Sequence, residues 1–392
     1  MPADDTQRRS FQLPLEISED SVTLDELRAH PGGVDFVVPE NYEVLASSPA
    51  LSGEVFAIQR LLSIARSKVT MTFVWCAPIA QRISELTRLQ PLLAVAVMLQ
   101  GVSHRLIGLT TEEAEDALVS AREAILKHRL IRNDLFTPSQ LLLCADSRGQ
   151  GRHEQLYLSR TGSLRPRDHF DTLVQEVLSN ELSTNADSRK FKWATGLGGV
   201  VAELFENTDM HAMTDLDGSR FSTNGIRGLM FRRIPWSVQL RGANYKLENV
   251  TKQALEISVF DTGIGYLRSY TRSTELPDIR FEWRVLHKCL ERHYAEDIPD
   301  SRPAHRALGL AHVLRTVQDA GGRIEIRTGR TFGYRTFIQG ELQAQMQPLG
   351  SDWSRFRWPR PRLLDMENKF STVPSAHEDT VGTAVRVIVP LS

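Results

Sequence analysis

The chain has 392 residues, of which 41% are hydrophobic and 24% are charged, and its formal net charge at pH 7 is −1. This length and apolar content predict two folded domains, and the near-zero charge excludes a global field that would draw the protein onto nucleic acid or an anionic membrane. The three cysteines, Cys76, Cys144 and Cys289, are too few and too scattered for a disulfide framework or a zinc site.

The sequence predicts a cytoplasmic protein without a membrane segment. Its most apolar stretch, residues 92–99, is much shorter than the roughly 18 residues that a membrane-spanning helix needs. The N-terminal segment, residues 1–9, is polar and lacks the apolar centre of a signal peptide. Scattered thiols also fit a reducing compartment.

The first part of the chain, residues 1–164, predicts a smaller α/β domain. Residue patterns predict strands at 34–39, 69–75 and 141–144 and helices at 53–65 and 111–130. Thr110 or Thr111 can cap the second of these helices, because acidic residues follow directly. Strands that alternate with helices indicate a small mixed sheet. This part shows no catalytic constellation, so we expect it to have a regulatory or partner-binding role.

The first functional pattern lies on a predicted helix around residues 200–212. Glu203, Asn207 and His211 are spaced four apart, so they share one helix face beside a row of apolar residues. A carboxylate and an amide held next to an apolar face suit a general base and a Mg²⁺ ligand. The alternative is a surface helix with a few polar residues, a spacing that chance often supplies.

The second pattern is a strand followed by glycines. Residues 254–261 alternate as a strand and end at Asp261, and Gly263 and Gly265 follow. The carboxylate can accept a hydrogen bond from an exocyclic amine, and the glycines let the backbone approach a flat ligand closely. The alternative is an ordinary Asp-x-Gly turn.

Two further segments complete the set. Residues 305–327 predict a turn of small residues, an amphipathic helix, a stop at Gly321 and Gly322, and a strand. Free N–H groups at the start of that helix suit a phosphate, and the alternative is a plain helix-to-strand connection. Residues 381–390 predict a strand that begins with Gly382 and Thr383.

In this order, the four segments resemble the N box, the Asp-x-Gly-x-Gly box, the lid-to-helix box and the final Gly-Thr strand of the GHKL superfamily of ATP-binding domains. That superfamily includes type II topoisomerases, the large heat-shock chaperone, histidine kinases and mismatch-repair ATPases. The resemblance covers residues 165–392. It implies a Bergerat-fold α/β sandwich, in which helices cover a mixed sheet and ATP with Mg²⁺ lies under a lid of residues 266–306. Because this segment is too long for a structureless connection, we expect a helix within it, and the spacing of residues 281–294 fits one.

The resemblance also implies roles for single residues. Asn207 would bind Mg²⁺, and Glu203 would polarise the attacking water or hydroxyl. Asp261 would accept the adenine amino group, and Thr383 would support that contact. His211 matches the histidine-kinase form of the N box, without an assigned role.

The remaining implied contacts involve the backbone and the lid. Close passage of the backbone, or N–H groups offered to phosphate, is expected at Gly263, Gly265, Leu308, Gly309 and Leu310. From its position at the end of the lid, Arg306 could bring a cation to the γ-phosphate as the lid closes, and the alternative is an ion pair with a nearby surface acid. The family's lid box often reads Gly-x-Gly-Leu-Gly, whereas Ala307 and Leu308 precede a single glycine here.

The resemblance predicts a stand-alone ATPase whose nucleotide state controls its interaction with an unidentified partner protein. One alternative is a serine/threonine or histidine protein kinase of the anti-sigma-factor type, and another is an ATP-sensing module that does not hydrolyse ATP. The nearest candidate phosphoacceptor, His104, is not followed by a two-helix hairpin. An insertion at about 340–375 is rich in Trp and Arg, which favours an irregular segment packed on its own domain or a protein contact over a site for single-stranded nucleic acid. The pattern leaves open whether the chain forms a homodimer.

Overall fold

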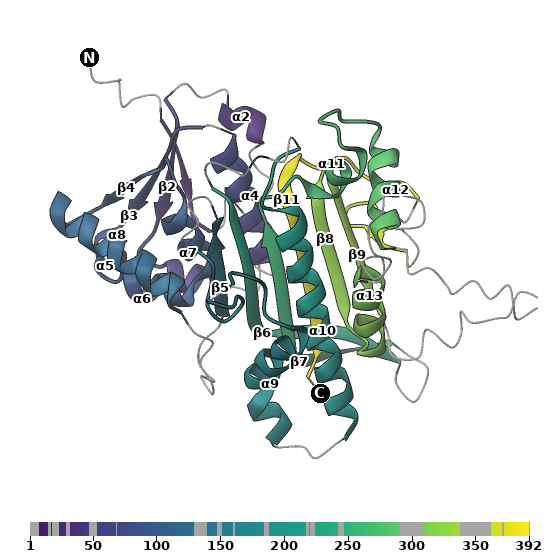
Figure 1. Ribbon diagram of the computed structural model, residues 1–392. Helices are drawn as coiled ribbons and strands as arrows, with labels where there is room; N and C mark the ends of the chain where they lie inside the picture. Colours follow the sequence, from purple (N-terminus) through teal and green to yellow (C-terminus); the bar gives the residue numbers. More distant parts are fainter. Residues whose placement is uncertain are drawn as a thin grey trace, which may run out of the picture.

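A computed structural model describes residues 8–14, 17, 23–28, 32–46, 53–67, 69–128, 139–146, 151–159, 161–183, 188–216, 219, 224–241, 247–290, 309–337, 362–370 and 372–391. Within these residues the strands form two sheets, one of four parallel strands and one of seven antiparallel strands (Figure 1). The protein is therefore of the α/β type that the sequence predicts.

The four-stranded sheet belongs to the N-terminal part of the chain. Its strands follow the sequence order β1 (Arg9–Gln12), β2 (Val34–Val38), β3 (Met71–Trp75) and β4 (Ser103–Leu106). The helices of this part are α2 (Leu24–Arg28), α3 (Tyr42–Ala46), α4 (Glu54–Arg66), α5 (Ala77–Gln81), α6 (Ile83–Leu89), α7 (Pro91–Met98) and α8 (Thr111–Leu126). All three strand pairs are parallel, whereas a mixed sheet was expected, because helical crossovers return the chain to the same edge each time.

Local sequence signals in this part match the structure closely. Helix α4 covers the helix predicted at 53–65, and β2 and β3 cover the strands predicted at 34–39 and 69–75. Thr110 caps α8 through a capping box, in which its hydroxyl accepts from the Glu113 N–H at 3.4 Å and its own N–H donates to the Glu113 carboxylate at 2.8 Å. The described part of this helix ends at Leu126 rather than at residue 130.

The seven-stranded sheet has the order β10-β9-β8-β11-β7-β6-β5. Its strands are β5 (Ser139–Ala145), β6 (Ile226–Arg241), β7 (Leu247–Asp261), β8 (Arg323–Gly329), β9 (Thr331–Thr336), β10 (Leu364–Asp365) and β11 (Thr380–Pro390). Every neighbouring pair is antiparallel, so the mixed sheet expected here is wrong in its strand directions. The predicted strand at 141–144 is β5, and it pairs with β6 of this sheet rather than with the four parallel strands.

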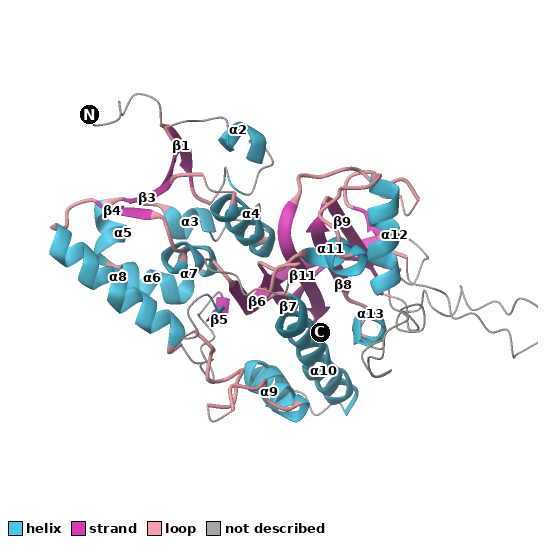
Figure 2. Cartoon of the chain, turned by 45° about the horizontal axis from the view of Figure 1, so that its top comes forward, coloured by secondary structure: helices cyan, strands magenta, loops and turns pink. Residues whose placement is uncertain are grey.

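Different helices pack on the two faces of this sheet. Helices α9 (Arg167–Ser183), α10 (Ser188–His211) and α13 (Gly309–Asp319) share a core with Leu255, Ile257 and Val259 of β7. On the opposite face, Phe260 packs in a second core with helices α4 and α7 of the N-terminal part. Figure 2 shows α4 and α10 on opposite sides of the sheet. Because side chains alternate along a strand, Asp261 lies on the α10 face with Val259.

The predicted lid begins with two helices, α11 (Gly265–Thr271) and α12 (Ile279–Cys289). Helix α12 confirms the helix expected within the lid, and Trp283, Leu286 and Leu290 are buried together as its spacing predicts. Residues 291–308 of the lid and 338–361 of the insertion lie outside the described residues. Among the residues that are described, no helix is long and apolar enough to cross a bilayer.

Candidate functional site

A small cavity lies between α10, α11 and the ends of β7 and β11. It is lined by Leu204, Asn207, Thr208, His211, Val259, Asp261, Gly265, Tyr266, Ser269, Thr383 and Val385. The structure thus brings together Asn207, His211, Asp261, Gly265 and Thr383 from three separate sequence motifs. The cavity volume of about 30 Å³ has room for about one water molecule, so a larger ligand would require the lining residues to move.

Asp261 closes the inner end of this cavity as the last residue of β7. Its Oδ1 accepts hydrogen bonds from the backbone N–H groups of Gly263 at 2.7 Å and Thr383 at 3.3 Å. Among the described residues no group donates to Oδ2. Burial raises the pKa of Asp261 to about 6, although the two backbone donors and Arg227 act in the opposite direction.

Behind Asp261, hydrogen bonds join the ends of β7 and β8 to the start of β11. The Gly382 N–H donates to the Gly263 carbonyl at 2.8 Å, and the Thr328 hydroxyl donates to the Gly382 carbonyl at 3.2 Å. Gly382 has a φ of 64°, and a Cβ there would collide with the backbone of Asp261. Only glycine can therefore let β11 approach β7 this closely.

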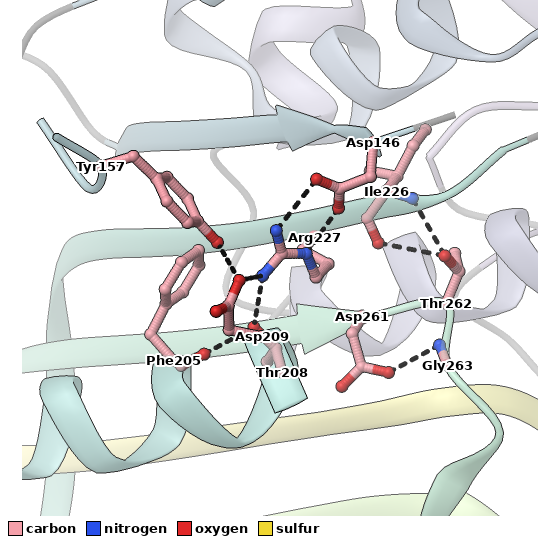
Figure 3. Close-up of polar contacts among 10 residues, drawn as sticks. All are labelled: Asp146, Tyr157, Phe205, Thr208, Asp209, Ile226, Arg227, Asp261, Thr262 and Gly263. Atoms are coloured by element: carbon pink, nitrogen blue, oxygen red, sulfur yellow. Dashed lines mark hydrogen bonds and ion pairs between the residues drawn. The ribbon is translucent and has the colours of Figure 1, made fainter. Parts of the chain in front are cut away.

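A buried arginine lies beside Asp261 in the β-ladder. The Arg227 guanidinium makes two contacts with Asp146, at 2.6 and 3.0 Å, and one with Asp209 at 3.2 Å. The Tyr157 hydroxyl donates to Asp209 at 2.6 Å, and Figure 3 shows this cluster next to Asp261. Asp209 follows Asn207 by two residues on α10, so the cluster holds the end of that helix against β5 and β6. Sequence reasoning missed Arg227, whose signal is a single cation within the apolar run of residues 226–231.

Glu203 is on the predicted face of α10 but does not line the cavity. It lies one helical turn before Asn207, and its Oε1 is 3.1 Å from Nη1 of Arg167, the first residue of α9. Burial raises the pKa of Glu203, and the Arg167 cation opposes that shift. The carboxylate predicted to be a base is therefore ion-paired in this state.

The lid-to-helix motif is partly described. Helix α13 begins at Gly309, and the side chain of Leu310 is buried in the core rather than open to the cavity. The predicted Gly-Gly stop is confirmed, because Gly321 has a φ of 65° and the Gly322 N–H bonds the Val317 carbonyl at 2.8 Å. Arg306 and Leu308 lie outside the described residues.

Helix α4 of the N-terminal part contacts the backbone of the site from the opposite face of the sheet. Arg66 donates to the Thr262 carbonyl at 2.6 Å. Ser63 accepts from the Val381 N–H at 3.0 Å, and Gln59 donates to the Val381 carbonyl at 3.2 Å. One helix thus binds the residues that follow Asp261 and precede Thr383.

His104, the nearest candidate phosphoacceptor, lies on a strand rather than on a dimerisation helix. Its Nδ1 accepts a hydrogen bond from the Trp75 indole at 3.2 Å, and its ring stacks on Phe73 with centroids 5.4 Å apart. Burial lowers the pKa of His104 to about 4. These contacts describe a histidine that packs in a core.

The carboxylate of Asp261 and the amide of Asn207 both line the cavity. Asp261 offers one acceptor oxygen, and the described residues contain no group of three or more His, Cys, Asp or Glu side chains that could hold a metal alone. Mg²⁺ is often bound in this way, with few protein ligands and with water and phosphate oxygens completing the shell. No protein-family model, curated protein or solved structure matches the chain.

Proposed function

We propose that this protein is a stand-alone GHKL-type ATPase that binds ATP with Mg²⁺ in the cavity between α10 and the ends of β7 and β11. In this proposal β5 and residues 165–392 form a Bergerat-type sandwich, and the nucleotide state controls the interaction with a partner protein. The observation that carries the proposal is the buried Asp261 carboxylate, which is held by Gly263 and Thr383 and faces a cavity shared with Asn207.

Asp261 would recognise adenine through its exocyclic amino group. Backbone donors occupy Oδ1 and leave Oδ2 as an acceptor, which matches an N–H donor on the edge of a base. The apolar side chains of Leu204, Val259 and Val385 would contact the flat ring. Because the cavity is small, α11 would move outward as the base enters, as a lid does.

Asn207 would hold the cation through its amide oxygen, one turn along α10 from His211. Bound Mg²⁺ supplies neutralisation of the charge on the phosphates. Glu203 would orient a water or hydroxyl toward the terminal phosphate, because phosphoryl transfer depends mainly on positioning and charge neutralisation. The ion pair of Glu203 with Arg167 favours a second candidate, an ATP-sensing module in which this carboxylate stays engaged and turnover is negligible.

The N-terminal part would transmit the nucleotide state. Helix α4 donates and accepts hydrogen bonds at Thr262 and Val381, the residues next to Asp261 and two before Thr383. A shift of these segments on nucleotide binding would therefore reach α4 and the four-stranded sheet. A partner that binds this part would sense the change.

Incubation with γ-labelled ATP, Mg²⁺ and the purified chain distinguishes the proposals. Released phosphate supports the ATPase, label transferred to an added partner supports a protein kinase, and bound intact ATP supports the sensing module. Glu203→Ala should leave binding nearly intact and lower turnover by about 100-fold or more, the scale of losing a general base. Asn207→Ala should weaken Mg²⁺-dependent binding as well. Parental turnover in Glu203→Ala contradicts the assigned base.

A further inference from the structure

Three helices bring an arginine, a glutamate and a histidine together beyond the cavity. Arg167 begins α9, Glu203 lies on α10, and His312 lies in the first turn of α13. Arg167 contacts Glu203 at 3.1 Å and donates from Nη2 to the Gly199 carbonyl at 3.4 Å. Arg167 lies outside the nucleotide-binding motifs of the sequence, and His312 lies within the lid-to-helix motif, residues 305–327, without an assigned role.

Gly199 makes room for the side chains of both Arg167 and His312. A Cβ at this position would lie 2.9 Å from Nη2 of Arg167 and 3.2 Å from Nε2 of His312. The two nitrogen atoms therefore both lie close to Gly199 of α10, one turn before Glu203. Burial lowers the pKa of His312, and the nearby Arg167 lowers it further, so the imidazole beside Arg167 is favoured in its neutral form.

The order of polar groups along α10 follows the order of groups in a nucleotide. The Asp261 end of the cavity lies near Ala212, since a Cβ on Gly263 would be 2.6 Å from the Ala212 Cα. Asn207 comes next, and Glu203 lies about 6 Å further along the helix axis, given its rise per residue. A base at Asp261 and a cation at Asn207 would therefore direct the terminal phosphate toward Glu203 and Arg167.

The charges at that end favour a second cation besides Mg²⁺. A terminal phosphate and the Glu203 carboxylate repel each other unless a positive group lies between them. The Arg167 side chain is 53% exposed and uses one nitrogen on Glu203, so its planar fork can turn toward a phosphate. Arg–phosphate pairs are often bidentate and belong to the strong, charge-assisted hydrogen bonds.

We propose that Arg167 binds the terminal phosphate of a nucleoside triphosphate, with His312 beside it, and releases Glu203 as it does so. This inference rests on the proposed ATP-binding function. It makes Arg167 the residue that distinguishes a triphosphate from a diphosphate. It also explains how the paired Glu203 becomes available only when the triphosphate is present.

The test compares Arg167→Met with the parent chain by titration calorimetry, using a non-hydrolysable ATP analogue and ADP, each with Mg²⁺. Methionine keeps the apolar stem and removes the charge. Affinity for the ATP analogue should fall about 10- to 150-fold, whereas affinity for ADP should stay within about twofold. Arg167→Lys should lose part of this preference. Arg82→Met is the matched control, because it removes an exposed cation that is also paired with carboxylates but lies in the N-terminal part, and it should change neither affinity.

A second comparison separates direct phosphate contact from simple neutralisation of Glu203. In a Glu203→Gln background, Arg167→Met should still weaken binding of the ATP analogue. If the double variant binds the analogue as tightly as Glu203→Gln alone, the proposed contact between Arg167 and the phosphate is wrong. If Arg167→Met weakens the binding of both nucleotides equally, or of neither, the inference about Arg167 is wrong. The proposal that the parent chain binds ATP would still stand. If the parent chain binds neither nucleotide, both the proposed function and the inference about Arg167 are wrong.

Discussion

The carboxyl group of Asp261 is buried, and its neighbours offset only part of the free-energy cost of ionising it there. Two backbone N–H groups and the Arg227 cation favour the charged form, yet burial still raises the pKa to about 6. The carboxyl is therefore close to half protonated in mildly acidic solution. Its role as an acceptor for an amine depends on the ionised form.

This pKa predicts the pH dependence of nucleotide binding. ATP affinity should be constant above neutrality and about tenfold weaker at about pH 5, because the proton must leave Asp261 before the amine can bind. The contribution of Asp261 to the free energy of unfolding changes with pH in the opposite direction to the ATP affinity. It is present below the ordinary pKa of 3.8 and is lost as pH rises through about 6, because the fold prefers the protonated carboxyl. Calorimetry across this range checks the prediction, and affinity that stays flat to pH 5 would contradict it.

Arg227 has a structural role that a substitution can measure. Arg227→Met should lower the free energy of unfolding by on the order of 3 kcal/mol, because Asp146 and Asp209 lose a buried partner. The matched control is Arg82→Met, since Arg82 also pairs with two carboxylates, those of Glu43 and Glu85, but is exposed. Urea unfolding should show a much smaller shift for the control. Equal shifts for the two variants would contradict the assigned role of the cluster.

At the scale of elements, the strand ends of the site are held from both sides. Helix α10 supplies Asn207 and His211 on one face of the sheet, and α4 supplies Gln59, Ser63 and Arg66 on the other. Hydrogen bonds from α4 go to the backbone, so they constrain the position of the loops rather than the chemistry of a side chain. The N-terminal part therefore contributes to the shape of the cavity without lining it.

The contact of α4 with the loop after β7 predicts a remote effect on binding. Arg66→Ala should weaken ATP binding about 3- to 10-fold, because the Thr262 carbonyl loses a donor and the loop that holds Asp261 loosens. Ser67→Ala is the control on the same helix, because its hydroxyl bonds only the Ile64 carbonyl of α4 itself. Calorimetry on both variants decides the point. An Arg66 variant that binds as the parent does would rule out this route of coupling.

Local patterns predict the elements well where a cap or an alternation is strong. The helices α4, α8 and α12 and the strands β7 and β11 lie where their residues indicate. Strand β6 escapes prediction, because Pro235 interrupts its pattern. Among the described residues, β5 pairs with residues 226–232 and does not reach Pro235, so this pairing needs no N–H from the proline.

Across the whole molecule, the contacts that are hard to predict are those between distant segments. The strand β5 follows the N-terminal part in sequence but joins the second sheet, and a single core then includes both α4 and Phe260. Arg227 and Asp146 are 81 residues apart, and Arg167 and Glu203 are 36 apart. Neither pair has a sequence motif, because each exists only after the sheet and helices have packed. The motif residues Asn207, Asp261, Gly265 and Thr383 could be predicted to converge, whereas the charges around them could not.

Titration of ATP with Mg²⁺ into the parent chain and into Asp261→Asn, followed by calorimetry, tests the central claim most directly. We expect the parent chain to bind ATP and the variant to bind about 10- to 150-fold more weakly, because a buried acceptor is partly replaced by a donor that faces the adenine amino group. Thermal unfolding of the variant in the absence of ligand checks that its fold is intact. A parent chain that does not bind ATP, or a folded variant that binds it equally well, would contradict the assignment of this cavity.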